Sequence, residues 1–177
     1  MAFTLQTLRE QVAAGEDSTR QFKSRIDNAD SLAAEMAAFA NANGGVIFIG
    51  VQDDGTISGI TSQEVHDANQ LISNAASQHV RSPLVVQTQN ILLENGNVVI
   101  ALTVPAGMDK PYFDRKGVIW LKAGADKRRI NSKEELRRFF QYSSQFHADE
   151  LPTKAGIDKL DKLLFRKKKK KRYDSDF

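Results

Sequence analysis

Residues 39–55 constrain the fold most, because this one stretch contains the end of a helix, a buried strand and an acidic turn. The helix is expected to stop at Asn43-Gly44, since both residues tolerate the left-handed conformation that terminates helices. The apolar run from Val46 to Val51 predicts a strand that is covered on both faces and therefore central. Asp53-Asp54-Gly55 predicts a tight turn that carries two carboxylates at the carboxyl end of that strand.

The rest of the chain predicts alternating helices and short strands. Asn95-Gly96 lies between two strand-like segments and is a strong hairpin signal, and Lys116-Gly117 joins a second hairpin. The last helix follows a Ser132 cap and places Leu136, Phe139 and Phe140 at core-facing spacing. Helices are expected over residues 5–14, 31–43, 62–77 and 133–146, and strands over residues 21–23, 46–51, 57–60, 84–93, 97–104, 112–114 and 118–121. The predicted fold class is α+β, with a mixed, largely antiparallel sheet packed with helices.

Length and composition fit one domain followed by an appendage, since the chain has 177 residues, of which 41% are hydrophobic. We expect a domain over residues 1–147, a linker or the start of a further segment over residues 148–165, and a disordered basic tail over residues 166–177. The tail contains seven consecutive cations, from Arg166 to Arg172, so it accounts for more than the whole net charge of +3. It serves either as a phosphate-binding arm or as a solvated end.

Several function classes are excluded by what the sequence lacks. Without cysteine there are no disulfides or thiolate metal sites, and no apolar segment approaches the roughly 18 residues that span a bilayer. We therefore expect a cytoplasmic protein with no membrane partner. The three histidines are too dispersed for a zinc site. No G-x4-G-K-[ST] or G-x-G-x-x-G sequence supports ATP hydrolysis, whereas simple nucleotide binding stays open.

Two segments together resemble a known family. Residues 15–23 read Gly-Glu-Asp-Ser-Thr-Arg-Gln-Phe-Lys, and they precede the helix end and strand described above. This order is similar to the AlbA_2 type of Schlafen domain, in which Glu-x4-Glu-Phe-Lys precedes Ala-Phe-Ala-Asn-x-x-Gly-Gly and an Ile-Gly-Val-x-Asp strand and turn. Residues 110–113 and 120–125 resemble later strands of that family, so the resemblance covers about residues 10–145. It implies a nucleic-acid-binding domain, DNA or RNA, of the kind found in transcriptional regulators and helicase-related proteins.

The resemblance also implies an acidic site at Glu16, position 21 and Asp53, which form the catalytic centre of ribonuclease members. Two carboxylates at such a site hold Mg²⁺ or Mn²⁺, which polarises a phosphate and activates water. Here Gln21 replaces the second glutamate and brings no negative charge. A metal-dependent ribonuclease weakened by Gln21 is therefore the alternative function. In the simpler interpretation, Glu16 is a loop acid and Asp53 forms a turn.

The basic residues suggest a phosphate track, because arginine and lysine contacts to phosphate dominate nucleic-acid affinity. Tyr112 and Phe113 would offer a stacking surface for unpaired bases. The alternatives are scattered solvated charge and a protein-interaction module. The candidate nucleic-acid-binding residues are Lys23, Arg25, Asn41, Asn43, Lys122, Lys127, Arg128 and Arg129.

Overall fold

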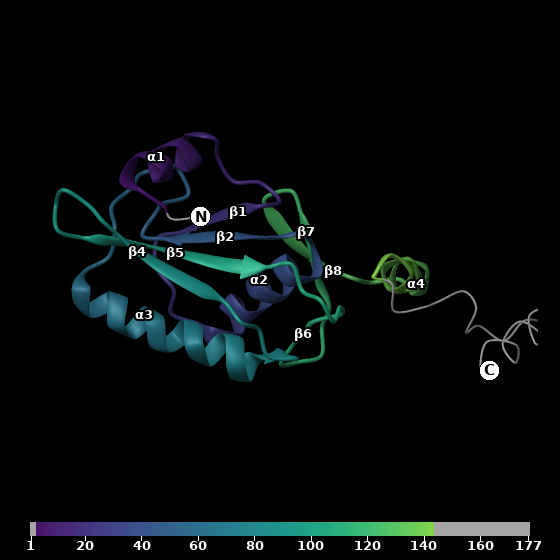
Figure 1. Ribbon diagram of the computed structural model, residues 1–177. Helices are drawn as coiled ribbons and strands as arrows, with labels where there is room; N and C mark the ends of the chain where they lie inside the picture. Colours follow the sequence, from purple (N-terminus) through teal and green to yellow (C-terminus); the bar gives the residue numbers. More distant parts are fainter. Residues whose placement is uncertain (1–2, 144–177) are drawn as a thin grey trace, which may run out of the picture. The chain divides into compact units, whose positions relative to one another are not determined.

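A four-stranded sheet organises the protein, as Figure 1 shows for the computed structural model, which describes residues 3–143. The strand order is β1 (Arg20–Lys23), β2 (Gly44–Ile49), β5 (Val98–Pro105) and β4 (Gln87–Leu92). β1 pairs with β2 in parallel, whereas β2 with β5 and β5 with β4 are antiparallel. The predicted fold class and the central place of residues 46–51 are confirmed. The linker and tail predicted for residues 148–177 lie outside the described residues.

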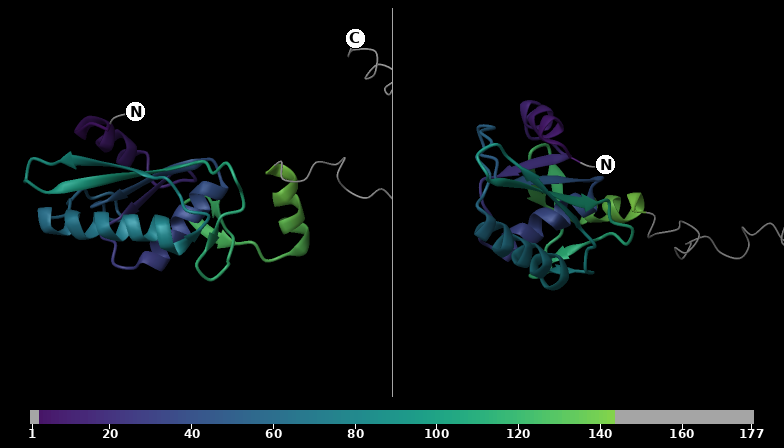
Figure 2. Two further views of the ribbon diagram at one scale, coloured as in Figure 1. Left: turned by 60° about the horizontal axis from the view of Figure 1, so that its bottom comes forward. Right: turned by 60° about the vertical axis from the view of Figure 1, so that its left-hand side comes forward.

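Helices cover both faces of this sheet because its strands alternate their side chains (Figures 1 and 2). Ile47 and Ile49 of β2 pack in a core formed with α2 (Ala29–Asn41) and α3 (Ser62–Asn74). Phe48, between them, points to the other face and packs in a second core that includes Leu8 of α1 (Leu5–Ala13). Apolar residues at successive positions of β2 are therefore explained by two separate cores.

Five short elements extend the fold beyond the sheet. After α3, a π-helical turn, η1 (Ala75–His79), leads into β3 (Val80–Arg81), which pairs with β6 (Phe113–Asp114). β7 (Trp120–Ala123) and β8 (Asp126–Arg129) form a hairpin, and β7 lies against α2 (Figure 1). The hairpin predicted through Lys116-Gly117 is reduced to the Asp114 N to Val118 O hydrogen bond of 3.0 Å and one bridge between Phe113 and Ile119.

The last described helix, α4 (Lys133–Tyr142), corrects one expectation. Ser132 caps it as predicted, accepting from Glu135 N at 3.0 Å. None of its residues is buried, so Leu136 and the two phenylalanines that follow do not face the core described here. Helical spacing identifies the apolar side of a helix but not what that side meets. No helix within residues 3–143 is both long and apolar enough to cross a bilayer.

Candidate nucleic-acid interface

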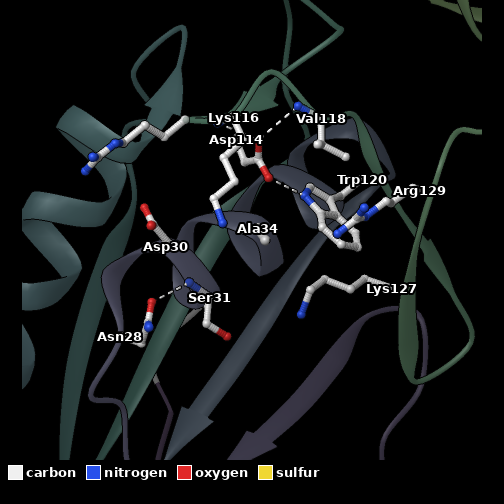
Figure 3. Close-up of a pocket in the computed structure, with 11 residues that line it drawn as sticks. Asn28, Asp30, Ser31, Ala34, Asp114, Lys116, Val118, Trp120, Lys127 and Arg129 are labelled. Atoms are coloured by element: carbon white, nitrogen blue, oxygen red, sulfur yellow. Dashed lines mark hydrogen bonds between the residues drawn. The ribbon is translucent and has the colours of Figure 1, made fainter.

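A cavity of about 390 Å³ lies over the first turn of α2 (Figure 3). Its other walls come from the segment between β6 and β7 and from β8. The lining carries four cations, Arg115, Lys116, Lys127 and Arg129, and two carboxylates, Asp30 and Asp114. The excess of positive charge suits an anionic ligand.

The indole of Trp120 forms a fixed wall of this cavity (Figure 3). Its Nε1 donates to Asp114 Oδ2 at 2.8 Å. Asp114 is 8% exposed, and its Oδ1 accepts from Lys116 N and Val118 N, each at 2.9 Å. The carboxylate is thus held by backbone donors, and it holds the ring in turn. The Arg129 guanidinium lies 4.9 Å from the ring centroid, within the range of a cation–π contact.

The Asp30 carboxylate is also engaged, by His79. His79 Nδ1 and Asp30 Oδ1 lie 2.6 Å apart. This hydrogen bond, supported by the charges of Arg115 and Lys116, lowers the pKa of Asp30 below its ordinary value. Both carboxylates of the cavity therefore have partners inside the protein. By contrast, Arg115, Lys116 and Arg129 form no ion pair with an acidic side chain in the described part of the chain.

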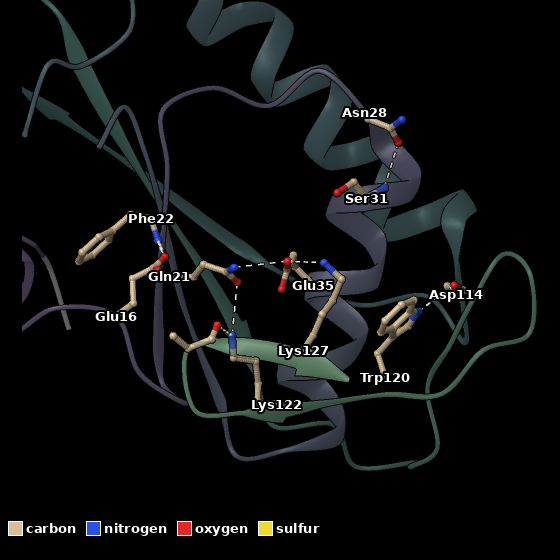
Figure 4. A network of polar contacts seen from close by, with 11 residues as sticks. Glu16, Gln21, Phe22, Asn28, Ser31, Glu35, Asp114, Trp120, Lys122 and Lys127 are labelled. Carbon is tan, nitrogen blue, oxygen red and sulfur yellow. Dashed lines mark hydrogen bonds and ion pairs between the residues drawn. The ribbon is translucent and has the colours of Figure 1, made fainter. Parts of the chain in front are cut away.

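Beside the cavity, a buried polar network joins β1, α2 and the β7–β8 hairpin (Figure 4). Glu35 of α2 is 3% exposed, and its Oε1 pairs with Lys127 Nζ at 2.5 Å. Gln21 Nε2 donates to the same oxygen at 3.3 Å. Lys122 Nζ donates to Ala125 O at 2.6 Å and to Gln21 Oε1 at 3.4 Å. The second oxygen of Glu35, Oε2, is buried and has no hydrogen-bond partner in the described structure.

Lys122 is half-buried and is engaged by contacts inside the protein. Burial lowers the pKa of its ammonium, and the carboxylates of Glu35 and Glu16 partly offset that effect. The ammonium also lies 4.7 Å from the ring centroid of Phe39. These contacts fasten the hairpin to β1 and α2.

The residues expected to form an acidic site do not fit a divalent cation. Glu16 Oε1 accepts from Phe22 N at 2.6 Å, and Gln21 Oε1 faces the ammonium of Lys122 (Figure 4). Asp53 is exposed in the turn after β2, which the Gly55 N to Gln52 O hydrogen bond of 2.9 Å closes. No group of three His, Cys, Asp or Glu side chains within residues 3–143 is placed to hold a metal ion. We therefore derive no catalytic step through Mg²⁺ or Mn²⁺.

The structure distributes the predicted basic residues over separate places. Arg25 pairs with Glu64 of α3 at 2.8 Å and is not among the residues that line the Trp120 cavity. Arg128 pairs with Glu135 of α4. Lys23 is half-buried at the end of β1. Of the predicted set, Lys127 and Arg129 line the cavity.

Asn41 and Tyr112 have structural roles instead of the ligand contacts expected for them. Asn41 is 4% exposed; its Nδ2 donates to Tyr112 O at 2.8 Å and to Trp120 O at 3.0 Å, and its Oδ1 accepts from Tyr112 N at 2.8 Å. Tyr112 is 7% exposed, too buried to stack on a base. The amide of Asn41 anchors the start of β7 to α2. Asn43 alone of the two asparagines is exposed.

Sequence reasoning missed Asp114, Arg115 and Lys116 as cavity residues and missed the role of Trp120. Two signals were present. Asp114-Arg115-Lys116-Gly117 places two cations on a turn, and Trp120 is the single tryptophan of the chain, three residues further on. The approach of α2 and β8 to this turn has no local signal, because it depends on tertiary contacts.

Comparisons with known proteins agree with this fold. The crystal structure of the DIP2311 protein from Corynebacterium diphtheriae has a TM-score of 0.51 and 22% identity, over 84% of this chain and 28% of that chain. The solution structure of the N-terminal domain of a putative ATP-dependent DNA helicase RecG-related protein from Nitrosomonas europaea has a TM-score of 0.50 and 19% identity, over 75% of this chain and 92% of that one. No curated protein matches the chain. The family model of the Schlafen AlbA_2 domain matches residues 16–131, and the chain therefore belongs to the Schlafen AlbA_2 family.

Proposed function

We propose that this domain binds nucleic acid through the cationic lining of the Trp120 cavity. The observation that carries the proposal is the placement of Arg115, Lys116 and Arg129, without acidic partners in the described structure, around one cavity. Cations of this kind gain affinity for phosphates by releasing the counterions of the nucleic acid. The similarity in fold to the N-terminal domain of a RecG-related helicase supports a nucleic-acid-associated role.

We infer that the domain has a regulatory binding role and not a ribonuclease role. A metal-dependent nuclease needs carboxylates that converge on a divalent cation. Here Gln21 Oε1 is turned to Lys122, and Glu16 accepts a backbone hydrogen bond of β1. In the neighbouring cluster, the negative charge of Glu35 is balanced by the ammonium group of a lysine.

Binding is expected to weaken steeply with salt. Three phosphate contacts predict a loss of affinity of about tenfold or more between about 50 and 200 mM salt. The measurement is fluorescence anisotropy of labelled DNA and RNA oligonucleotides titrated with the full chain at each salt concentration. Affinity that does not change with salt would contradict a phosphate-based interface.

A matched pair of variants separates this cavity from general positive charge. Arg115→Ser combined with Arg129→Ser removes two cations of the cavity. The control, Arg137→Ser combined with Arg138→Ser, removes two exposed cations elsewhere that also lack an ion-pair partner in the described structure, and it leaves the same net charge. The cavity variant is expected to bind about tenfold more weakly than the control at low salt and to show a shallower salt dependence. Equal losses in the two variants would place the binding surface elsewhere.

A further inference from the structure

We propose that the Trp120 cavity takes one unpaired base of a single-stranded nucleic acid, stacked on the indole, so that the domain prefers single strands to duplexes. This inference rests on the proposed function and specifies its ligand. The features that carry it are the fixed ring, the exposed Arg129 guanidinium over its face, and the size of the cavity (Figure 3).

The ring is prepared for stacking because its position is set by internal contacts. Asp114 accepts the indole N–H at 2.8 Å and is itself held by two backbone N–H groups. Asn41 Nδ2 donates to Trp120 O at 3.0 Å and fixes the backbone of the same residue. A ligand that stacks on this indole therefore does not have to immobilise it first, and less conformational entropy is lost on binding.

The two cations near the ring are held differently. Lys127 Nζ lies 5.6 Å from the ring centroid but is tied to the buried carboxylate of Glu35. Arg129 is exposed, and its guanidinium lies 4.9 Å from the centroid without an acidic partner in the described structure. A base that stacks on the indole takes the place of the Arg129 guanidinium. The displaced guanidinium then lies beside the phosphate that flanks the base, which is the pairing its planar fork favours.

The size of the cavity suits a small planar group such as a base. Its volume of about 390 Å³ lies at the lower end of the range for small-molecule sites. Bases in a duplex are stacked on one another and cannot present a face to a side chain unless one is extruded, whereas single strands offer every base to an aromatic ring. A duplex would contact only the exposed cations around the cavity, namely Arg115, Lys116 and Arg129. It should therefore bind by charge alone and more weakly.

Stacking of a base on the indole can be followed by intrinsic fluorescence, because Trp120 is the single tryptophan of the chain. We would titrate the full chain with a single-stranded DNA of eight nucleotides, the RNA of the same sequence, the matched DNA duplex and inorganic phosphate. Intrinsic fluorescence would be followed together with anisotropy of the labelled oligonucleotides. Single strands are expected to quench the tryptophan over the same concentration range in which they bind. Duplex is expected to bind several-fold more weakly with little quenching, and phosphate to leave the emission unchanged.

Trp120→Ala is expected to reduce single-strand affinity about tenfold, as for the loss of one stacked base, and to reduce duplex affinity much less. Trp120→Phe, which keeps an aromatic face, should retain most of the single-strand affinity. If Trp120→Ala fails to fold by circular dichroism, Trp120→Met takes its place, since it fills more of the vacated volume than alanine does and has no ring. Equal affinity for duplex and single strand, unaffected by loss of the ring, would overturn the base-binding inference and leave the proposed function standing. No binding of any nucleic acid in the anisotropy arm would overturn both.

Discussion

Lys127→Met is expected to lower the free energy of unfolding by about 3 kcal/mol, because it leaves the buried carboxylate of Glu35 without its cation. Glu35 is 3% exposed, and its Oε2 already lacks a hydrogen-bond partner in the described structure. After the substitution, only the Gln21 amide at 3.3 Å remains on Oε1. Chemical denaturation of the parent and the variant measures the difference.

Substitution of the other partner, Glu35, should lower the free energy of unfolding much less. This difference distinguishes an unpaired buried charge from a simple loss of contacts. Glu35→Gln removes the buried charge, and the Lys127 side chain, 22% exposed, can turn its ammonium to water. We expect a change within about 1 kcal/mol for Glu35→Gln, and substantial recovery when Glu35→Gln is added to Lys127→Met. Arg129→Met, an exposed cation on the same strand, is the control and should change stability by about 0.5 kcal/mol or less. A small effect of Lys127→Met, equal to that of the control, would contradict this account.

The large loss of stability expected for Lys127→Met affects how binding should be tested. Lys127 lines the cavity, and substitution of Lys127 together with Arg128 and Arg129 would be a direct test if these residues only contacted ligand. Because Lys127 also neutralises Glu35, that triple variant would lose stability and affinity together. Variants of Arg115 and Arg129 avoid the problem, since neither residue pairs with a buried acid in the described structure.

The sequence pattern predicted those parts of the fold that are determined by residues close together in the chain. The apolar run of β2 indicated a central strand, and Asn95-Gly96 indicated the β4–β5 hairpin, whose Gly96 has a φ of +82°. β8 was missed because Asp126–Arg129 contains only charged residues, with no alternation that would indicate a strand. Its pairing with β7 and the turn at Gly124, with a φ of +65°, determine its conformation.

The candidate site was less predictable because tertiary contacts assemble it. Glu35 lies in a helix of mostly apolar residues, and nothing in its spacing shows that Lys127, 92 positions later, neutralises it. Asn41 was taken for a ligand contact because it stands near the glycine pair, whereas it is buried and its amide makes three hydrogen bonds to the backbone of Tyr112 and Trp120. Polar residues near a suggestive motif are assigned correctly only when their partners are known.

Gly44→Ala is expected to destabilise the domain by about 3 kcal/mol, and so to lower the melting temperature by about 10 °C. Two effects add. The φ of Gly44 is +76°, a left-handed conformation that a residue with a Cβ adopts only at a cost of about 1–2 kcal/mol. A Cβ at this position would also lie 2.6 Å from Ala106 N and 2.7 Å from Val104 O. Both are backbone atoms at the end of β5, so neither can move aside as a flexible side chain would.

Gly96→Ala separates the two effects, because Gly96 has a similar φ of +82° but a methyl group there would meet no other atom within 4 Å in the described structure. Its cost should be the conformational part alone, about 1 kcal/mol. Thermal denaturation of the two variants, followed by circular dichroism, gives the difference that close packing against β5 contributes. Equal melting temperatures would mean that the β2–β5 contact relaxes around the methyl group.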